Sequence, residues 1–158
     1  MIQRVQTLYL ATLIILLSMV TFGSTLFSFV NEASRFEFSS YGIVEYSELN
    51  NEIIDSQTFP FFIGTISLIL IAFITLMSFK NLDRQFKLGR MVFYIYFIML
   101  ISVIVLATFG DSMLDVETNR REMGLGFFLF SAGFPFSFLA NTGIKRDRAL
   151  LNSLDRLR

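Results

Sequence analysis

The residues of this chain offer little material for catalysis. Histidine and cysteine are both absent, which excludes the commonest zinc, haem and iron–sulfur ligand sets and the nucleophile pairs built on Cys or on Ser with His. Gly124-Leu125-Gly126 lacks the third glycine and the following lysine of a phosphate-binding loop, so we interpret it as a packing site. Asp111 is the acid nearest to an apolar run, and a helix-end carboxylate is favoured over a catalytic one. The sequence therefore predicts no enzyme, no cofactor and no metal site.

The residues best suited to binding lie near the C-terminus. Their leucines can form an apolar stripe along a helix that also carries basic side chains. Such a helix suits the surface of an anionic membrane, and it equally suits a groove on a partner protein, so both interpretations stay open. Asn141-Thr142-Gly143, just before this segment, is expected to loosen the helix. The predicted docking residues are Lys145, Arg146, Arg148, Leu150, Leu151, Leu154 and Leu157.

Four apolar runs without a charged residue must position these side chains. Each run is close to the ~20 residues that a helix needs to cross a ~30 Å hydrocarbon core. The first run is about twice as long as a signal-peptide core of roughly 7 to 15 residues, so we interpret it as a retained helix. The prediction is one all-α membrane domain over residues 1–158, with four transmembrane helices at about residues 8–30, 59–79, 91–109 and 123–139.

The charges sort by sign between the segments that join these runs. The N-terminus, residues 80–90 and the tail over residues 140–158 hold ten of the thirteen basic residues, while the other two connectors hold ten of the thirteen acidic residues. The zero net charge therefore divides into +7 on one side and −7 on the other. Because short loops rich in Lys and Arg stay in the cytoplasm, both termini are predicted to be cytoplasmic.

The outer loop over residues 31–58 is long enough to have structure of its own. Polar and aromatic residues alternate in Arg35-Phe36-Glu37-Phe38, turn residues follow, and a β-branched pattern resumes at Ile43. This pattern predicts a small β-hairpin over residues 35–46, with Gly42 at positive φ and an aromatic side resting on the helix ends. Residues 48–55 are acidic, with apolar positions spaced as in a short amphipathic helix, and a solvated loop is favoured over a binding surface for them.

Three segments carry a resemblance to a known family: MIQRVQTLYL at residues 1–10, LANTGIKRD at residues 139–147 and DRLR at residues 155–158. They are similar to the ends of a family of short four-span inner-membrane proteins of Bacteroidota, described only as a domain of unknown function. The similarity of spacing and topology extends over the whole chain. The resemblance implies that the protein is located in the bacterial inner membrane, and it gives no information on an activity or a substrate.

Three classes of function remain. We favour a non-enzymatic accessory subunit of a larger inner-membrane complex, in protein export or envelope biogenesis, because the runs lack the charges that transporters need. The alternative is a lipid- or small-molecule-binding membrane module with a phenylalanine-lined pocket under the hairpin. A transporter or enzyme needs functional groups that are missing. The expected partners are membrane lipids and other inner-membrane proteins, and nucleic acid is not expected.

Overall fold

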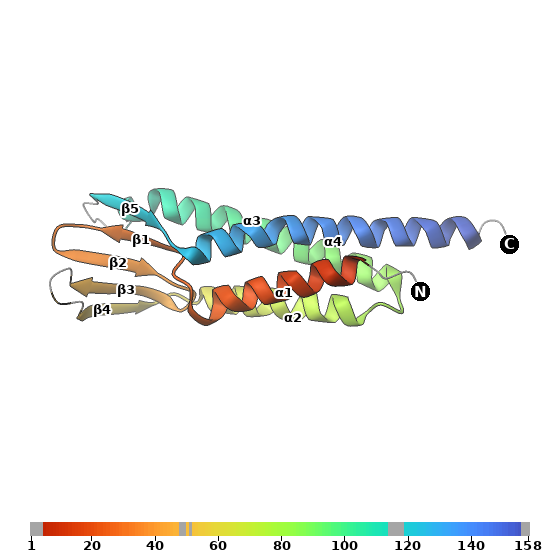
Figure 1. The fold of residues 1–158 in the computed structure, drawn as a ribbon, viewed down its shortest axis with the longest axis horizontal. Coiled ribbons are helices and arrows are strands. Elements are labelled where there is room, and N and C mark those ends of the chain that lie inside the picture. Colours follow the sequence, from red (N-terminus) through yellow and green to blue (C-terminus); the bar gives the residue numbers. More distant parts are fainter. Residues whose placement is uncertain (1–4, 48–49, 51, 114–118, 156–158) are drawn as a thin grey trace.

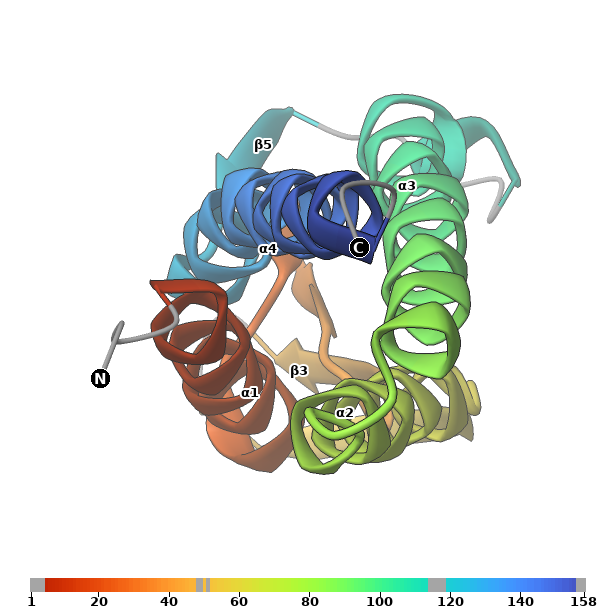
Figure 2. The same ribbon diagram turned by 90° about the vertical axis from the view of Figure 1, so that its right-hand side faces the viewer.

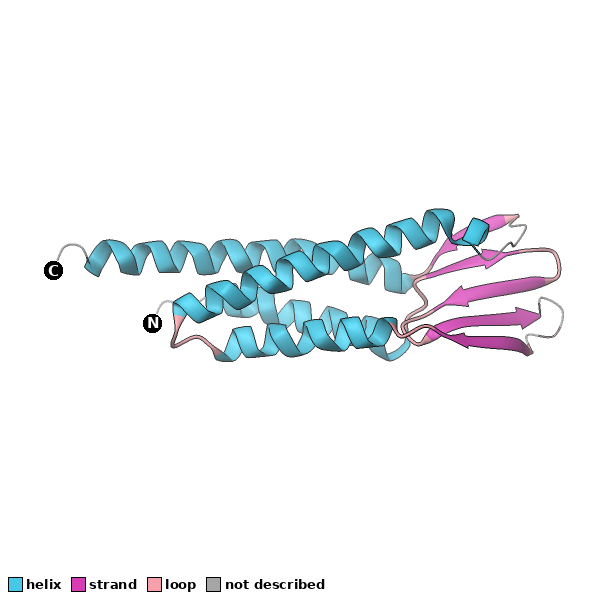
Figure 3. Ribbon diagram, turned by 180° about the vertical axis from the view of Figure 1, so that it is seen from behind, coloured by secondary structure: helices cyan, strands magenta, loops and turns pink. Residues whose placement is uncertain are grey.

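The structure is a computed structural model that describes residues 5–47, 50, 52–113 and 119–155. Its helices lie together in one bundle, and its strands extend from one end of that bundle (Figure 1). We call this the sheet end. α1 begins and α4 ends at the opposite end, which we call the terminal end, and α4 projects beyond the other helices there (Figures 1 and 3).

The described residues form four helices, which follow one another around a ring (Figure 2). The side chains that pack between the helices are fully buried, among them Leu13, Leu68, Tyr96 and Phe130. α3 begins after Asn81, whose side chain accepts a hydrogen bond from the backbone N–H of Arg84 at 3.1 Å, as an N-cap does. The helices are α1 Val5–Gly23, α2 Phe61–Met77, α3 Leu82–Met113 and α4 Leu125–Asp155.

Three of these helices, α1, α3 and α4, are long and apolar enough to cross a membrane. Large apolar side chains also cover the outside of the bundle, with Leu8, Leu70 and Ile98 each more than half exposed. The prediction of four spanning helices is wrong, because α2 has only 17 residues and is about 26 Å long at 1.5 Å per residue. Phe59 and Pro60, expected to begin that span, precede the helix. The three long helices indicate a membrane protein.

The strands form one five-stranded antiparallel sheet in the order β4-β3-β2-β1-β5. β5 comes from the connector between α3 and α4, and it pairs with β1 from the connector between α1 and α2. The two connectors of the sheet end are therefore joined in a single sheet. The strands are β1 Phe27–Val30, β2 Ser34–Phe38, β3 Gly42–Ser47, β4 Ile53–Thr58 and β5 Arg120–Met123.

This sheet makes the predicted all-α class wrong. Residues 35–46 do contain an antiparallel pair, formed by β2 and β3, but the pair is the centre of a larger sheet and not a small hairpin. The acidic stretch, interpreted as a solvated loop with a helix-like spacing of its apolar residues, ends in β4 instead. Backbone pairing with neighbouring strands decided these elements, and the periodicity of one segment alone does not reveal its pairing partner.

Gly42 also differs from its prediction. Its backbone lies outside the left-handed region, so positive φ does not explain the glycine. A Cβ atom at this position would instead collide with the backbone carbonyl of Gln57 on β4. Glycine is needed here because β4 approaches the start of β3 too closely for any side chain.

Candidate functional site

The two faces of the sheet differ in chemistry. Side chains alternate between faces along a strand, and directly paired residues share a face. Phe27 pairs with Phe38 and Phe29 pairs with Phe36, so all four rings lie on one face, which we call the aromatic face. Ile43 joins them through its pairing with Phe38.

The opposite face carries ion pairs. Arg35 lies 3.1 Å from Glu37 and 3.7 Å from Glu122, and Arg120 lies 3.1 Å from Glu122. These side chains come from β2 and β5, the two strands on either side of β1. The described charges on this face therefore neutralise one another, and we call it the charged face.

Hydrogen bonds between the sheet and the helices hold the aromatic face in place. The buried Ser40 hydroxyl donates to the Val20 carbonyl of α1 at 2.9 Å. The Arg121 guanidinium of β5 donates to the Thr108 carbonyl of α3 at 2.8 Å and forms an ion pair with Asp111. Asp111 is therefore a helix-end carboxylate that ties α3 to the sheet, which leaves the end of α3 against the aromatic face.

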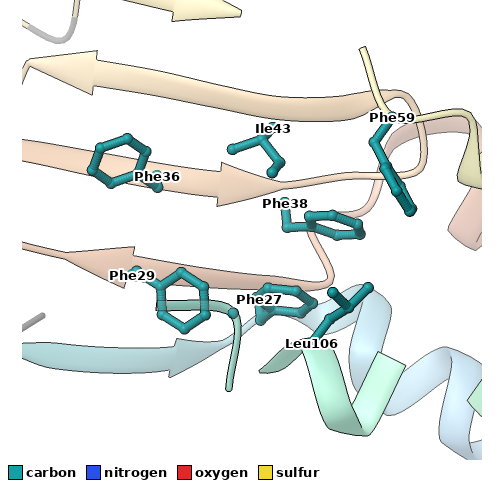
Figure 4. Close-up of a pocket in the computed structure, with 8 residues that line it drawn as sticks. Phe27, Phe29, Phe36, Phe38, Ile43, Phe59 and Leu106 are labelled. Carbon is teal, nitrogen blue, oxygen red and sulfur yellow. The ribbon is translucent and has the colours of Figure 1, made fainter. Parts of the chain in front are cut away.

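A pocket lies between the aromatic face and α3 (Figure 4). The rings of Phe27 and Phe38 stack with centroids 4.7 Å apart, and Phe59 adds a third ring 5.6 Å from Phe38. The pocket encloses about 100 Å³. Its lining residues are Phe27, Phe29, Phe36, Phe38, Ile43, Phe59, Leu106 and Gly110.

The lining restricts what the pocket can do. None of these eight residues has an ionisable, hydroxyl or thiol side chain, so they can bind hydrocarbon but cannot transfer a proton or attack a substrate. An apolar cavity of roughly 150 Å³ takes up benzene, so this smaller one suits a short length of hydrocarbon chain. Among the described residues there is also no group of three or more acidic side chains that could hold a metal ion.

Residues 2–157 match the family described as "Domain of unknown function (DUF4293)". The chain belongs to the DUF4293 family. The match confirms the resemblance to a family of unknown function that the sequence suggested. No protein with a curated description matches this DUF4293 member.

The predicted docking residues of this DUF4293 member lie away from the pocket, at the terminal end of α4. Lys145 and Arg146 are exposed. Arg148 instead folds back on α3, where its guanidinium lies 2.7 Å from Asp83 and over the ring of Phe86. Leu150 is largely exposed. The side chains of Leu151 and Leu154 lie outside the described part of the chain, as does the whole of Leu157.

The expected loosening of this helix is wrong. α4 runs without interruption from Leu125 to Asp155, through Asn141-Thr142-Gly143. Gly143 faces α1, where an added Cβ would lie 3.2 Å from the Cβ of Gln6. The glycine therefore lets two helices approach closely, which is the usual use of small residues between membrane helices.

The sequence placed only three of the eight lining residues, Phe36, Phe38 and Ile43, in the predicted hairpin, and it assigned Phe59 to the second apolar run. Phe27 and Phe29 were assigned to the first apolar run, and Leu106 lies in the third run with Gly110 just beyond it. A local signal was available for the first pair, because Gly23-Ser24-Thr25 can end a helix and Phe27-Ser28-Phe29 alternates with a period of two. No local signal could place α3 beside these rings.

Proposed function

We propose that this protein is a non-enzymatic membrane module that holds a hydrocarbon chain in the pocket between the aromatic face and α3. The observation that carries this proposal is an apolar cavity of about 100 Å³ lined by five phenylalanines at one end of three long apolar helices. An exposed cavity of this kind is costly in water but accessible to the chains of surrounding lipids. A lipid acyl chain is the most abundant apolar ligand at that position.

The orientation in the membrane is part of the proposal. The sheet end carries the acidic residues Glu32, Glu45 and Asp55, whereas the terminal end carries Lys145 and Arg146. Because short basic segments stay in the cytoplasm, we infer that the terminal end is cytoplasmic and that the sheet lies on the outer side of a bacterial inner membrane.

Because the chain has no cysteine, single cysteines can report the orientation without a background. Glu32→Cys and Lys145→Cys both place a thiol at an exposed position. We expect a membrane-impermeant maleimide to label Glu32→Cys in intact spheroplasts, and Lys145→Cys only after lysis. Labelling of Lys145→Cys in intact spheroplasts would contradict the orientation.

The pocket is tested by filling it. Leu106→Trp adds a large ring from α3 into the cavity, while Val105→Trp adds the same ring at an exposed position one residue away. The protein is placed in phosphatidylcholine nanodiscs with an alkyl alcohol that carries a diazirine at its chain end. After irradiation, the labelled peptides are measured by mass spectrometry.

We expect the native protein and Val105→Trp to be labelled at the segments that contain Phe36 and Phe59. Leu106→Trp should lower that labelling about fivefold or more, since losing even 1 kcal/mol of binding free energy has that effect. If Leu106→Trp and Val105→Trp are labelled equally, or if the native pocket is not labelled, the proposal fails.

A second candidate, an accessory subunit of a larger inner-membrane assembly, is favoured by a different observation. β4 is an edge strand exposed over its whole length, with Ile53 63 % and Ile54 58 % exposed. Long exposed edges with apolar residues are sites where another chain adds a strand. An assembly for protein export or envelope biogenesis would offer such a partner.

To test this candidate, the tagged protein is extracted in mild detergent, and the proteins that co-purify with it are identified by mass spectrometry. If β4 binds a partner strand, Ile54→Pro should release a stoichiometric protein that Ser56→Ala retains, because proline removes a backbone donor and alanine does not. If the tail of α4 is the contact, Leu151→Asp with Leu154→Asp should release it instead. A chain that purifies without any stoichiometric protein is not a subunit.

A further inference from the structure

The pocket of the aromatic face does not end at its phenylalanines. A second, smaller cavity of about 50 Å³ lies beside it, and the two share Phe36 and Ile43. The second cavity is lined further by Glu45, Asp55 and Gln57 of β3 and β4. The two cavities therefore adjoin on the aromatic face, and we call them together the groove, which is apolar next to α3 and polar next to the edge strand β4.

The charges at the polar end are arranged unfavourably for the protein alone. Glu45 and Asp55 are direct cross-strand partners, and like charges in that position destabilise a sheet. The structure shows no ion pair between either carboxylate and any basic side chain that it describes. On the charged face, by contrast, Glu37 and Glu122 are paired with arginines.

We propose that the groove binds an amphiphile with a hydrocarbon chain in the phenylalanine pocket and an amine-bearing head between Glu45 and Asp55. This rests on the proposed function, because it names the ligand of the same pocket. An ammonium group offers positive charge and N–H donors to both carboxylates and to the Gln57 amide oxygen. An acid or sulfate head would add a third negative charge at the same place.

The test compares two probes of equal chain length, an alkylamine and an alkyl carboxylate, each with a diazirine at the chain end. The protein is held in phosphatidylcholine nanodiscs at neutral pH and about 0.15 M salt, where a Debye length of about 8 Å screens distant charges. We expect the amine to label the segments with Phe36 and Phe59 about tenfold more than the carboxylate, which corresponds to about 1.4 kcal/mol.

Two double variants locate the cause of that preference. Glu45→Gln with Asp55→Asn removes the two carboxylates of the groove and should bring the ratio of amine to carboxylate labelling to about one. Glu32→Gln with Glu52→Gln removes two exposed charges of the same end and should leave the preference intact. Resistance to protease confirms that each variant remains folded.

The outcomes separate this inference from the proposed function. If the native pocket takes both probes equally, or if the groove variant keeps the native preference, the amine head is wrong while the hydrocarbon site stands. If neither probe labels the pocket, the proposed function fails and the inference fails with it. Diazirine-bearing phosphatidylethanolamine and phosphatidylglycerol, tested in the same way, distinguish a membrane lipid from a free amine as the source of the head.

Discussion

Aromatic side chains are used in two different ways in this protein. Inside the helical bundle, Tyr96 and Phe130 stack with centroids 4.9 Å apart, and both are fully buried. On the aromatic face, Phe27 and Phe38 stack at a similar 4.7 Å but border a cavity of about 100 Å³. Similar ring contacts thus belong to a closed core inside the helical bundle but border an open cavity on the aromatic face. Removing or adding atoms should therefore have different effects in the two regions.

The largest difference is expected when a ring is removed. Phe130→Ala empties a closed site and should lower the free energy of unfolding by about 3–5 kcal/mol. Phe36→Ala should cost only about 1 kcal/mol, because its ring is partly exposed and borders existing cavities. Unfolding in mixed micelles, followed by circular dichroism, measures both, and similar costs would show that the aromatic face is as tightly packed as the bundle.

Adding one methyl group in the bundle should have the next largest effect. A Cβ at Gly133 would collide with the Tyr96 hydroxyl, which donates a hydrogen bond to the Phe130 carbonyl at 2.6 Å. Gly133→Ala should therefore cost about 1–3 kcal/mol in the same unfolding experiment. Gly23→Ala is the matched control, because nothing lies within 4 Å of a Cβ there. An unaffected Gly133→Ala would mean that the bundle is not closed around Tyr96.

An added methyl group within the sheet should act locally. Gly42→Ala brings a Cβ against the Gln57 carbonyl, so we expect β4 to separate from β3 and the segment around residues 53–58 to be cleaved faster by protease. Ser56→Ala, on the exposed β4, should behave like the native protein. Ser40→Ala would be a poor control, because the Ser40 hydroxyl donates a hydrogen bond to the Val20 carbonyl of α1. Equal cleavage of Gly42→Ala and Ser56→Ala would show that this contact does not hold β4.

The smallest effects concern charges on the two faces of the sheet, and they should have opposite signs. Asp55→Asn relieves the like-charge pair with Glu45 and should stabilise the ligand-free protein by about 0.5 kcal/mol. Glu122→Gln removes the partner of Arg35 and Arg120 and should destabilise it by up to about 1 kcal/mol. Thermal unfolding in detergent measures the difference. If Asp55→Asn is destabilising, the groove carboxylates are not in conflict and the argument for an amine head loses its main support.

Local pattern predicted part of the site and missed the rest for a physical reason. The alternation in β2 and β3 correctly placed Phe36, Phe38 and Ile43 in paired strands, because a period of two is a property of each strand alone. Phe27 was assigned to a helix, because it lies within the first uninterrupted apolar run of residues 8–30. The residues that begin β4 were assigned to a solvated acidic loop with helix-like spacing, because two adjacent isoleucines do not show the alternation of a strand.

What the sequence by itself determined is the set of long apolar segments and the division of charge between their connectors. Both depend only on local composition, which sets whether a segment can be surrounded by hydrocarbon or must face water. The tertiary structure alone decided that β5 pairs with β1, whose residues lie 90 to 96 positions earlier in the chain, and that Leu106 and Gly110 meet the phenylalanines of the aromatic face. Such contacts arise when distant segments pack together, and the groove exists only because these segments meet without filling the space between them.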